Sequence, residues 1–190
     1  MNREQALQLL KDYIKTENVL KHMLASEAIM RALARKFSED EEQWGIIGLL
    51  HDIDWDLTKD NPSQHCTKAI EILKQAGVDD FIIETIVSHG YGFDFNEELK
   101  NKQRSTKIQH SLAAAETATG LIVAAALMQP DKKLSSVRNE SLKKKFKDKR
   151  FTANCSRDII LECEKIGLTL EEFLEISLKA MQSISNDLGL

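Results

Sequence analysis

The sequence predicts an all-α protein. Only eight glycines and two prolines interrupt its 190 residues. Along most of the chain, apolar side chains recur every three or four residues, which is the spacing of a helix with one buried face. The segment FIIETIV at 81–87 has the composition of a strand, but no second segment is suited to pair with it. A chain of this length most simply forms one domain, and we expect about 7–9 helices.

Capping residues set the limits of the first four expected helices. Asn18 and the capping-box sequence SEDE at 38–41 are start signals for the second and third. Pro62 is favoured in the first turn of the fourth, and Gly77 is placed to end it. In chain order these helices are expected over residues 3–15, 18–33, 38–50 and 61–77.

The second half of the chain shows the same kinds of signal. Gly90, Pro130 and Gly167 are stop signals, and TLEE at 169–172 is a second capping box. We therefore expect further helices over residues 79–89, 105–128, 154–166 and 169–187. The polar, lysine-dense segment 131–151 is expected to lie on the surface as a loop with a short helix.

Composition excludes several classes of protein. The net charge of −4 argues against general nucleic-acid binding and against a membrane-surface role. The longest apolar run, residues 121–128, is too short to span a bilayer. Residues 1–13 lack the apolar region of a secretory signal peptide. Three cysteines, Cys66, Cys155 and Cys163, have no CxxC spacing and are expected to be free thiols in the cytoplasm.

The histidines are the most informative residues for function. Most of the five copies fall on apolar helix faces or at helix ends beside them: His22, His51, His65, His89 and His110. Taken singly, each is most simply a hydrogen-bonded core or surface residue, and the direction of His110 is the least defined. Taken together, buried imidazoles need partners for both ring nitrogens, and a metal ion satisfies several at once.

One acid also faces inward in this pattern. Glu116 lies within the alanine-rich sequence AAAETATG. A carboxylate among such residues needs a cation or strong hydrogen-bond donors to stay ionised. The alternatives are a protonated side chain or a position at the rim of a cleft.

His22, followed about 30 residues later by His51-Asp52 and then by an acid on a later helix, resembles the signature of the HD-domain superfamily of metal-dependent phosphohydrolases. The resemblance is greatest to the small bacterial HDIG-type predicted hydrolases. Elements similar to theirs occur in the same order: GLLHDID at 48–54, His65, SHG at 88–90 and TGLI at 119–122. The resemblance extends from Leu20 to Met181. One residue departs from it, because Glu116 stands where that subgroup has aspartate.

The resemblance implies a single HD domain over 1–190, with an HD core over about 18–128 and a C-terminal helical extension over about 131–190. It also implies one or two divalent transition-metal ions, drawn from Fe, Mn, Co, Ni and Zn. The implied ligands of the first ion are His22, His51, Asp52 and Glu116. His65 and His89 resemble the residues that hold a second ion, with Asp52 as the bridge between the two.

The implied activity is hydrolysis of a phosphate ester of a small molecule, with a nucleotide as one candidate, by metal-activated water. Asp52 and His65 are the expected catalytic residues. Asp54 is expected to be a solvated turn acid, with orientation of a ligating histidine as its alternative role. Donors available to bind substrate phosphate are His110, Lys132, Lys133, Lys143 to Lys145 and Arg157.

Two other functions stay open. A catalytically impaired regulatory module that binds a nucleotide would explain the exchange at Glu116. A diiron oxygenase is the second alternative, since some proteins of the HD fold are similar to such enzymes. Nothing in the sequence favours the oxygenase.

Overall fold

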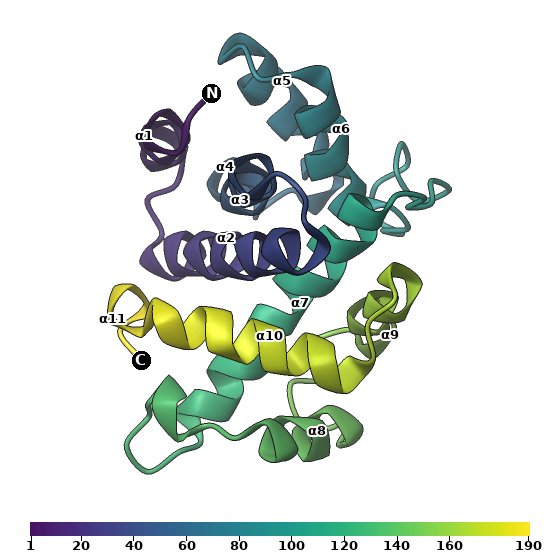
Figure 1. The fold of residues 1–190 in the computed structure, drawn as a ribbon. Coiled ribbons are helices and arrows are strands. Elements are labelled where there is room, and N and C mark those ends of the chain that lie inside the picture. Colours follow the sequence, from purple (N-terminus) through teal and green to yellow (C-terminus); the bar gives the residue numbers. More distant parts are fainter.

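The structure, a computed structural model, describes all residues from 1 to 190, which form helices and turns without a strand (Figure 1). The all-α prediction is confirmed. Eight helices have eight residues or more: α1 (Arg3–Tyr13), α2 (Glu17–Phe37), α3 (Glu41–Leu50), α5 (Thr67–Gln75), α6 (Asp80–Val87), α7 (Lys107–Leu127), α8 (Asn139–Lys147) and α10 (Leu170–Ser183). Shorter helices complete the chain: the single turns α4 (Trp55–Thr58), α9 (Arg157–Ile160) and α11 (Ser185–Leu188), the 3-10 turns η1 (Pro62–Gln64), η2 (Ser88–Gly90) and η3 (Leu134–Ser136), and the six-residue 3-10 helix η4 (Leu161–Ile166).

Helices α2 and α7 form the centre of the molecule (Figure 1). Helix α3 packs along α2, and α10 packs against both α2 and α7. One continuous cluster of buried apolar side chains runs through these contacts. Helix α7 is long and apolar enough, by length and composition, to cross a membrane, but most of it is buried inside this fold.

The start of α2 differs from the prediction. Its N-cap is Thr16, not Asn18. The carboxylate of Asp56 accepts hydrogen bonds from Lys15 N at 2.7 Å and from Thr16 N at 2.9 Å. A contact with a distant segment therefore fixes where this helix begins, and local capping propensity does not.

The predicted capping box at 38–41 does not form. Ser38 has a left-handed backbone conformation (φ 57°) and ends α2, so it is not available to begin the next helix. Asp40 is the N-cap of α3, and its carboxylate accepts a hydrogen bond from Gln43 N at 2.9 Å. By contrast, Thr169 forms its predicted capping box with Glu172 at the start of α10.

The helix predicted over 61–77 is divided in two. Pro62 begins helical backbone, but η1 stops at Gln64 and α5 begins only at Thr67. Between them, Cys66 has a positive φ of 69°. This break turns the backbone at His65, whose side chain is buried.

Gly48 allows α2 and α3 to approach closely. A Cβ atom at position 48 would lie 2.8 Å from Ser26 O, which is closer than side chains pack. One turn later, α3 ends and the chain reaches His51, whose Nδ1 donates to Gly48 O at 2.9 Å. The close approach therefore brings His51 beside His22 of α2.

Candidate metal centre

The carboxylate of Asp52 lies between two pairs of histidines. Its Oδ1 atom is 3.1 Å from His89 Nε2 and 3.4 Å from His65 Nε2. Its Oδ2 atom is 3.5 Å from His51 Nε2 and 3.6 Å from His22 Nε2. Each oxygen therefore faces one pair of imidazoles, and five residues predicted to be ligands come together.

These side chains come from helix ends and one helix interior. His22 lies within α2, while His51 and Asp52 follow the last residue of α3. His65 lies at the break before α5, and His89 lies in η2. Consecutive side chains on a helix diverge by about 100°. His51, just after the last residue of α3, still has helical backbone angles (φ −60°, ψ −36°), and both side chains nevertheless reach the centre.

Each of the four histidines has a hydrogen-bond acceptor for its Nδ1 atom. The pairs are His22 with Thr119 Oγ1 at 2.8 Å, His51 with Gly48 O at 2.9 Å, His65 with Asp54 Oδ1 at 2.9 Å, and His89 with Ile86 O at 2.6 Å. The Thr119 hydroxyl donates its own hydrogen to Glu116 O at 2.7 Å, so it accepts from His22. A proton on Nδ1 leaves a lone pair on Nε2, which is how metal-binding histidines are commonly oriented.

The lone pairs face one another at short distance. His22 Nε2 is 3.0 Å from His51 Nε2, and His65 Nε2 is 3.2 Å from His89 Nε2. Metal–nitrogen distances of about 2.0–2.1 Å place neighbouring ligand atoms about 3.0–3.4 Å apart. Four lone pairs and a carboxylate at these distances repel one another unless a cation lies among them. The donor set therefore fits divalent transition-metal ions, in two groups that share Asp52.

Protons take the place of the cation when no ion is bound. Burial lowers the pKa of His65, but hydrogen bonds to Asp52 and Asp54 raise that pKa well above its usual range. Burial also lowers the pKa of His89, but Cys66 and Asp52 raise that pKa well above its usual value. Burial lowers the pKa of His51 to about 3, so this imidazole stays neutral. Metal binding at the centre therefore competes with protons.

Glu116 lies beside the centre, at a cavity. It is partly exposed on α7, where burial raises the pKa of its carboxyl. Together with His22 and Phe93, it lines a cavity of about 400 Å³. It belongs to neither of the two groups of converging donor atoms. Direct coordination by Glu116 stays a prediction.

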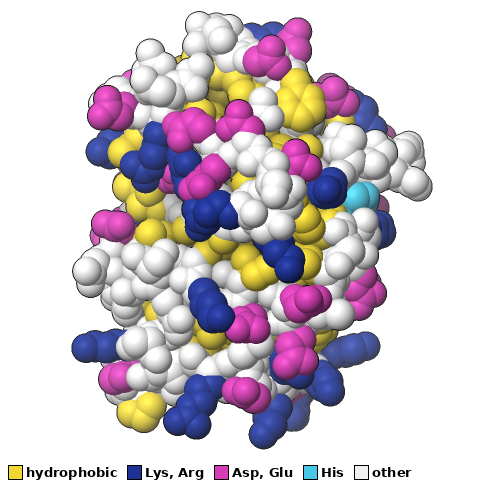
Figure 2. All heavy atoms as spheres, viewed as in Figure 1, with side chains coloured by type: hydrophobic (Ala, Val, Ile, Leu, Met, Phe, Trp, Pro, Cys, Tyr) yellow, Lys and Arg dark blue, Asp and Glu magenta, His cyan; other side chains and the backbone are white.

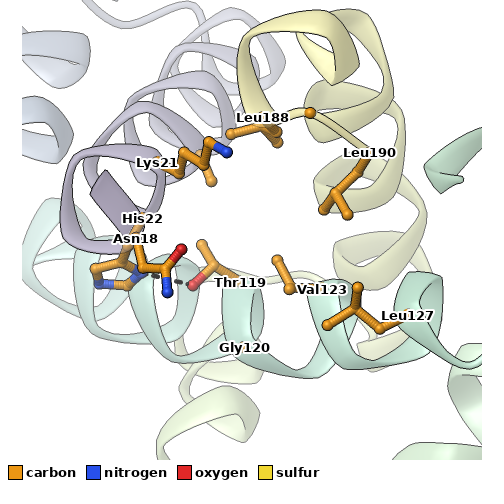
Figure 3. A pocket seen from close by; sticks show the side chains of 11 residues that line it. Asn18, Lys21, His22, Thr119, Gly120, Val123, Leu127, Leu188 and Leu190 are labelled. Atoms are coloured by element: carbon orange, nitrogen blue, oxygen red, sulfur yellow. Dashed lines mark hydrogen bonds between the residues drawn. The ribbon is translucent and has the colours of Figure 1, made fainter. Parts of the chain in front are cut away.

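A second cavity, of about 420 Å³, shares His22 and Thr119 with the first. Figure 3 shows it between α2, α7 and the last residues of the chain, with the hydrogen bond from His22 to Thr119 at its edge. Apolar side chains form much of its wall, and Lys21 is its one basic residue. The His22 end of the metal centre is therefore the end that meets open space.

Among the residues predicted to bind substrate, His110 and Arg157 have protein partners and Lys133 lies on the surface. His110 is buried, and its Nδ1 donates to Glu162 Oε2 at 2.6 Å. Arg157 donates to backbone carbonyl oxygens of α8 and of the loop after it, including Phe146 O at 3.1 Å and Cys155 O at 2.7 Å. Lys133 is exposed on the surface. The contacts of His110 and Arg157 account for both side chains without a substrate.

Two further residues near the centre were not named among its ligands. The expectation that Asp54 is a solvated turn acid is wrong, because Asp54 is fully buried and accepts hydrogen bonds from His65 Nδ1 and from Ala69 N, as its alternative role of orienting a histidine requires. The thiol of Cys66 lies 3.6 Å from His89 Nε2. The available signals were the position of Asp54 between two apolar residues and the adjacency of Cys66 to His65.

Replacement of the Asp54 carboxylate tests its role in orienting His65. We expect Asp54→Ala to weaken binding of the ion at His65 and His89 by about 10- to 100-fold, the usual effect of losing such a partner. Chelator-competition titration measures this affinity, and circular dichroism shows whether the variant is folded. The matched control is Asp60→Ala, an exposed acid of the same segment. Unchanged affinity in a folded Asp54→Ala protein would contradict the role.

Comparison with known proteins agrees with this geometry. The family model described as HD domain matches residues 19–126, which is more than half of the chain. The matched segment includes every predicted metal ligand, from His22 to Glu116. No curated protein and no solved structure matches the chain. The chain belongs to the HD-domain superfamily of metal-dependent phosphohydrolases.

Proposed function

We propose that this protein hydrolyses a phosphate ester of a small molecule at a centre of two divalent metal ions. The observation that carries the proposal is the convergence of four imidazole lone pairs on the two oxygens of one carboxylate. Divalent ions held there lower the pKa of water and neutralise charge on phosphoryl oxygens.

The two sides of the centre differ in how far their side chains are exposed to solvent. The side chains of His22 and Asp52 are 26% and 15% exposed, whereas those of His65 and His89 are nearly enclosed. The substrate phosphate therefore approaches from the side of His22. Asp52, which faces both pairs, holds and orients the nucleophile in this proposal, and His65 holds the inner side of the centre.

The cavity beside Glu116 supports a substrate of nucleotide size. Its volume of about 400 Å³ lies in the range of ligand pockets. Phe93 offers an aromatic face, and Asn154 and Ser156 offer polar groups. A nucleotide combines a phosphate with an aromatic ring and polar edges, so we propose this class of substrate.

The charge distribution supports a small-molecule partner. Figure 2 shows acidic and basic side chains interspersed over the face in view, without a broad basic area. The three free cysteines favour a reducing compartment, and we place the protein in the cytoplasm.

Elemental analysis combined with an activity assay tests the function. We expect two transition-metal ions per chain and hydrolysis of p-nitrophenyl phosphate or its bis ester, lost on chelation and restored by Zn²⁺ or Co²⁺. A metal-free protein that still binds a nucleotide would show a regulatory module and not a hydrolase. Iron-dependent oxygen consumption without hydrolysis would show an oxygenase.

A further inference from the structure

Cys66 has a backbone conformation that is rare for a residue with a side chain. Its φ and ψ are 69° and −38°, at the break between η1 and α5. In a continuous helix, His65 and Cys66 would point about 100° apart. At this break both side chains are buried and both lie near His89. Rare conformations of this kind are found at functional sites, where the surroundings hold them in place.

The thiol completes a compact set of donor atoms. One donor atom each from His65, Cys66 and His89 lies within 4.8 Å of the other two. Asp52 Oδ1 is 3.1 Å from His89 Nε2 and 3.4 Å from His65 Nε2. The two imidazole nitrogens thus lie near the sulfur on one side and near a carboxylate oxygen on the other.

Neighbouring residues hold the thiol in this place. A Cβ atom at position 90 would lie 2.5 Å from Cys66 Sγ, so the absence of a side chain at Gly90 makes room for the sulfur. The buried Asn96 donates from Nδ2 to His65 O at 3.0 Å and fixes the backbone just before Cys66. The sulfur has a defined position beside the imidazole of His89.

We propose that Cys66 binds as a thiolate to the metal ion held by His65, His89 and Asp52, an inference that rests on the proposed metal centre. On binding, the S–H proton goes to solvent and a metal–sulfur bond forms. Four protein ligands give a closed coordination sphere of the kind that zinc adopts when it is not open to substrate. Sulfur also selects zinc, iron or cobalt over manganese or magnesium.

The two ions of the centre then differ in chemistry. The group of His22, His51 and Asp52 supplies only nitrogen and oxygen, and it lies toward the cavities. It keeps room for water and substrate. The inner group, with the sulfur, would anchor Asp52 and add its positive charge to the centre. The competing arrangement is a neutral thiol that only packs against His89.

Cobalt substitution distinguishes a thiolate ligand from a packed thiol. Wild-type protein loaded with Co²⁺ should show a sulfur-to-cobalt charge-transfer band in the near ultraviolet. Cys66→Ser should lose this band, and Cys155→Ser, which changes a half-buried cysteine outside the donor group, should keep it. If the wild type binds two Co²⁺ ions without showing the band, Cys66 is not a ligand, and the proposed hydrolase function is unaffected. Loss of the band in Cys155→Ser would also overturn Cys66 as the ligand.

X-ray absorption at the zinc edge tests the same ligand in wild-type protein alone, so it does not depend on a variant that folds. We expect a sulfur neighbour at about 2.3 Å in addition to nitrogen and oxygen at about 2.0–2.2 Å. A spectrum of two bound zinc ions with nitrogen and oxygen only would rule out Cys66. A protein that binds no ion would overturn this inference and the proposed function together.

Discussion

Asp52→Ala is expected to remove both metal ions and phosphoester hydrolysis. Asp52 is the one residue whose oxygens face both histidine pairs, so its loss opens both groups at once. It also leaves four imidazole lone pairs facing one another without an anion to attract a cation. The loss in metal affinity should exceed the roughly 100-fold upper effect of removing a partner that only orients a ligand. Elemental analysis and the p-nitrophenyl phosphate assay measure the two losses.

The matched control for this variant is again Asp60→Ala, which should keep both the ions and the activity. Circular dichroism of Asp52→Ala should show the helices in place, since Asp52 is not part of the buried apolar cluster. Retained hydrolysis in a folded Asp52→Ala protein would be incompatible with the proposed mechanism.

Glu162→Ala is expected to destabilise the fold by about 3–5 kcal/mol, as removal of one partner from a buried ion pair does. Glu162 accepts hydrogen bonds from Arg104 Nη2 at 2.6 Å and from His110 Nδ1 at 2.6 Å. The side chains of Arg104 and Glu162 are only 9% and 10% exposed, so the guanidinium would remain buried without its counterion. Urea unfolding measures the change in the free energy of unfolding.

The same contacts connect stability to the metal centre and to pH. Arg104 also donates to the carbonyl oxygens of Ser88, His89 and Tyr91, at 3.0, 3.2 and 3.0 Å. Burial raises the pKa of Glu162, but Arg104 and His110 lower it to below the usual value. This stabilisation is therefore present above the usual glutamate pKa, and it is lost as pH falls through the lower value of the folded state.

Glu164→Ala is the control for Glu162→Ala, because Glu164 is an exposed acid of the same turn. Its free energy of unfolding should stay within about 0.5 kcal/mol of the wild type. A change below about 1 kcal/mol in Glu162→Ala would show that the buried network adds little to stability.

The sequence predicted helices well where the apolar spacing is local, and poorly where distant residues decide their ends. The long α7 and the cap at Thr169 follow from neighbouring residues alone. The start of α2 depends on Asp56, about 40 residues away, and no local signal indicates that contact. The thiol of Cys66, at the break between η1 and α5, likewise packs against a distant residue, Gly90, which has no side chain to exclude it.

For the candidate site, the histidines could be singled out because they are scarce and fall on apolar helix faces, and Asp52 was grouped with them through the resemblance to HD-domain proteins. The residues that support them could not be singled out in this way. Glu162 is 52 residues from His110 and 58 from Arg104 along the chain. Its neighbours Leu161, Cys163 and Glu164 give no indication of either partner. Only the folded structure shows that these groups neutralise one another in the interior.

The hydrogen bond from His22 to Thr119 joins residues that are 97 positions apart, and the proposed ligands draw together five separate segments of the chain. A bound ion is thus a cross-link as well as a reagent. Any ligand that binds only the folded chain adds to its stability, by about 2.7 kcal/mol at a free concentration 100 times its dissociation constant. Metal supply would then set how much folded protein a cell retains, as well as how fast each molecule works.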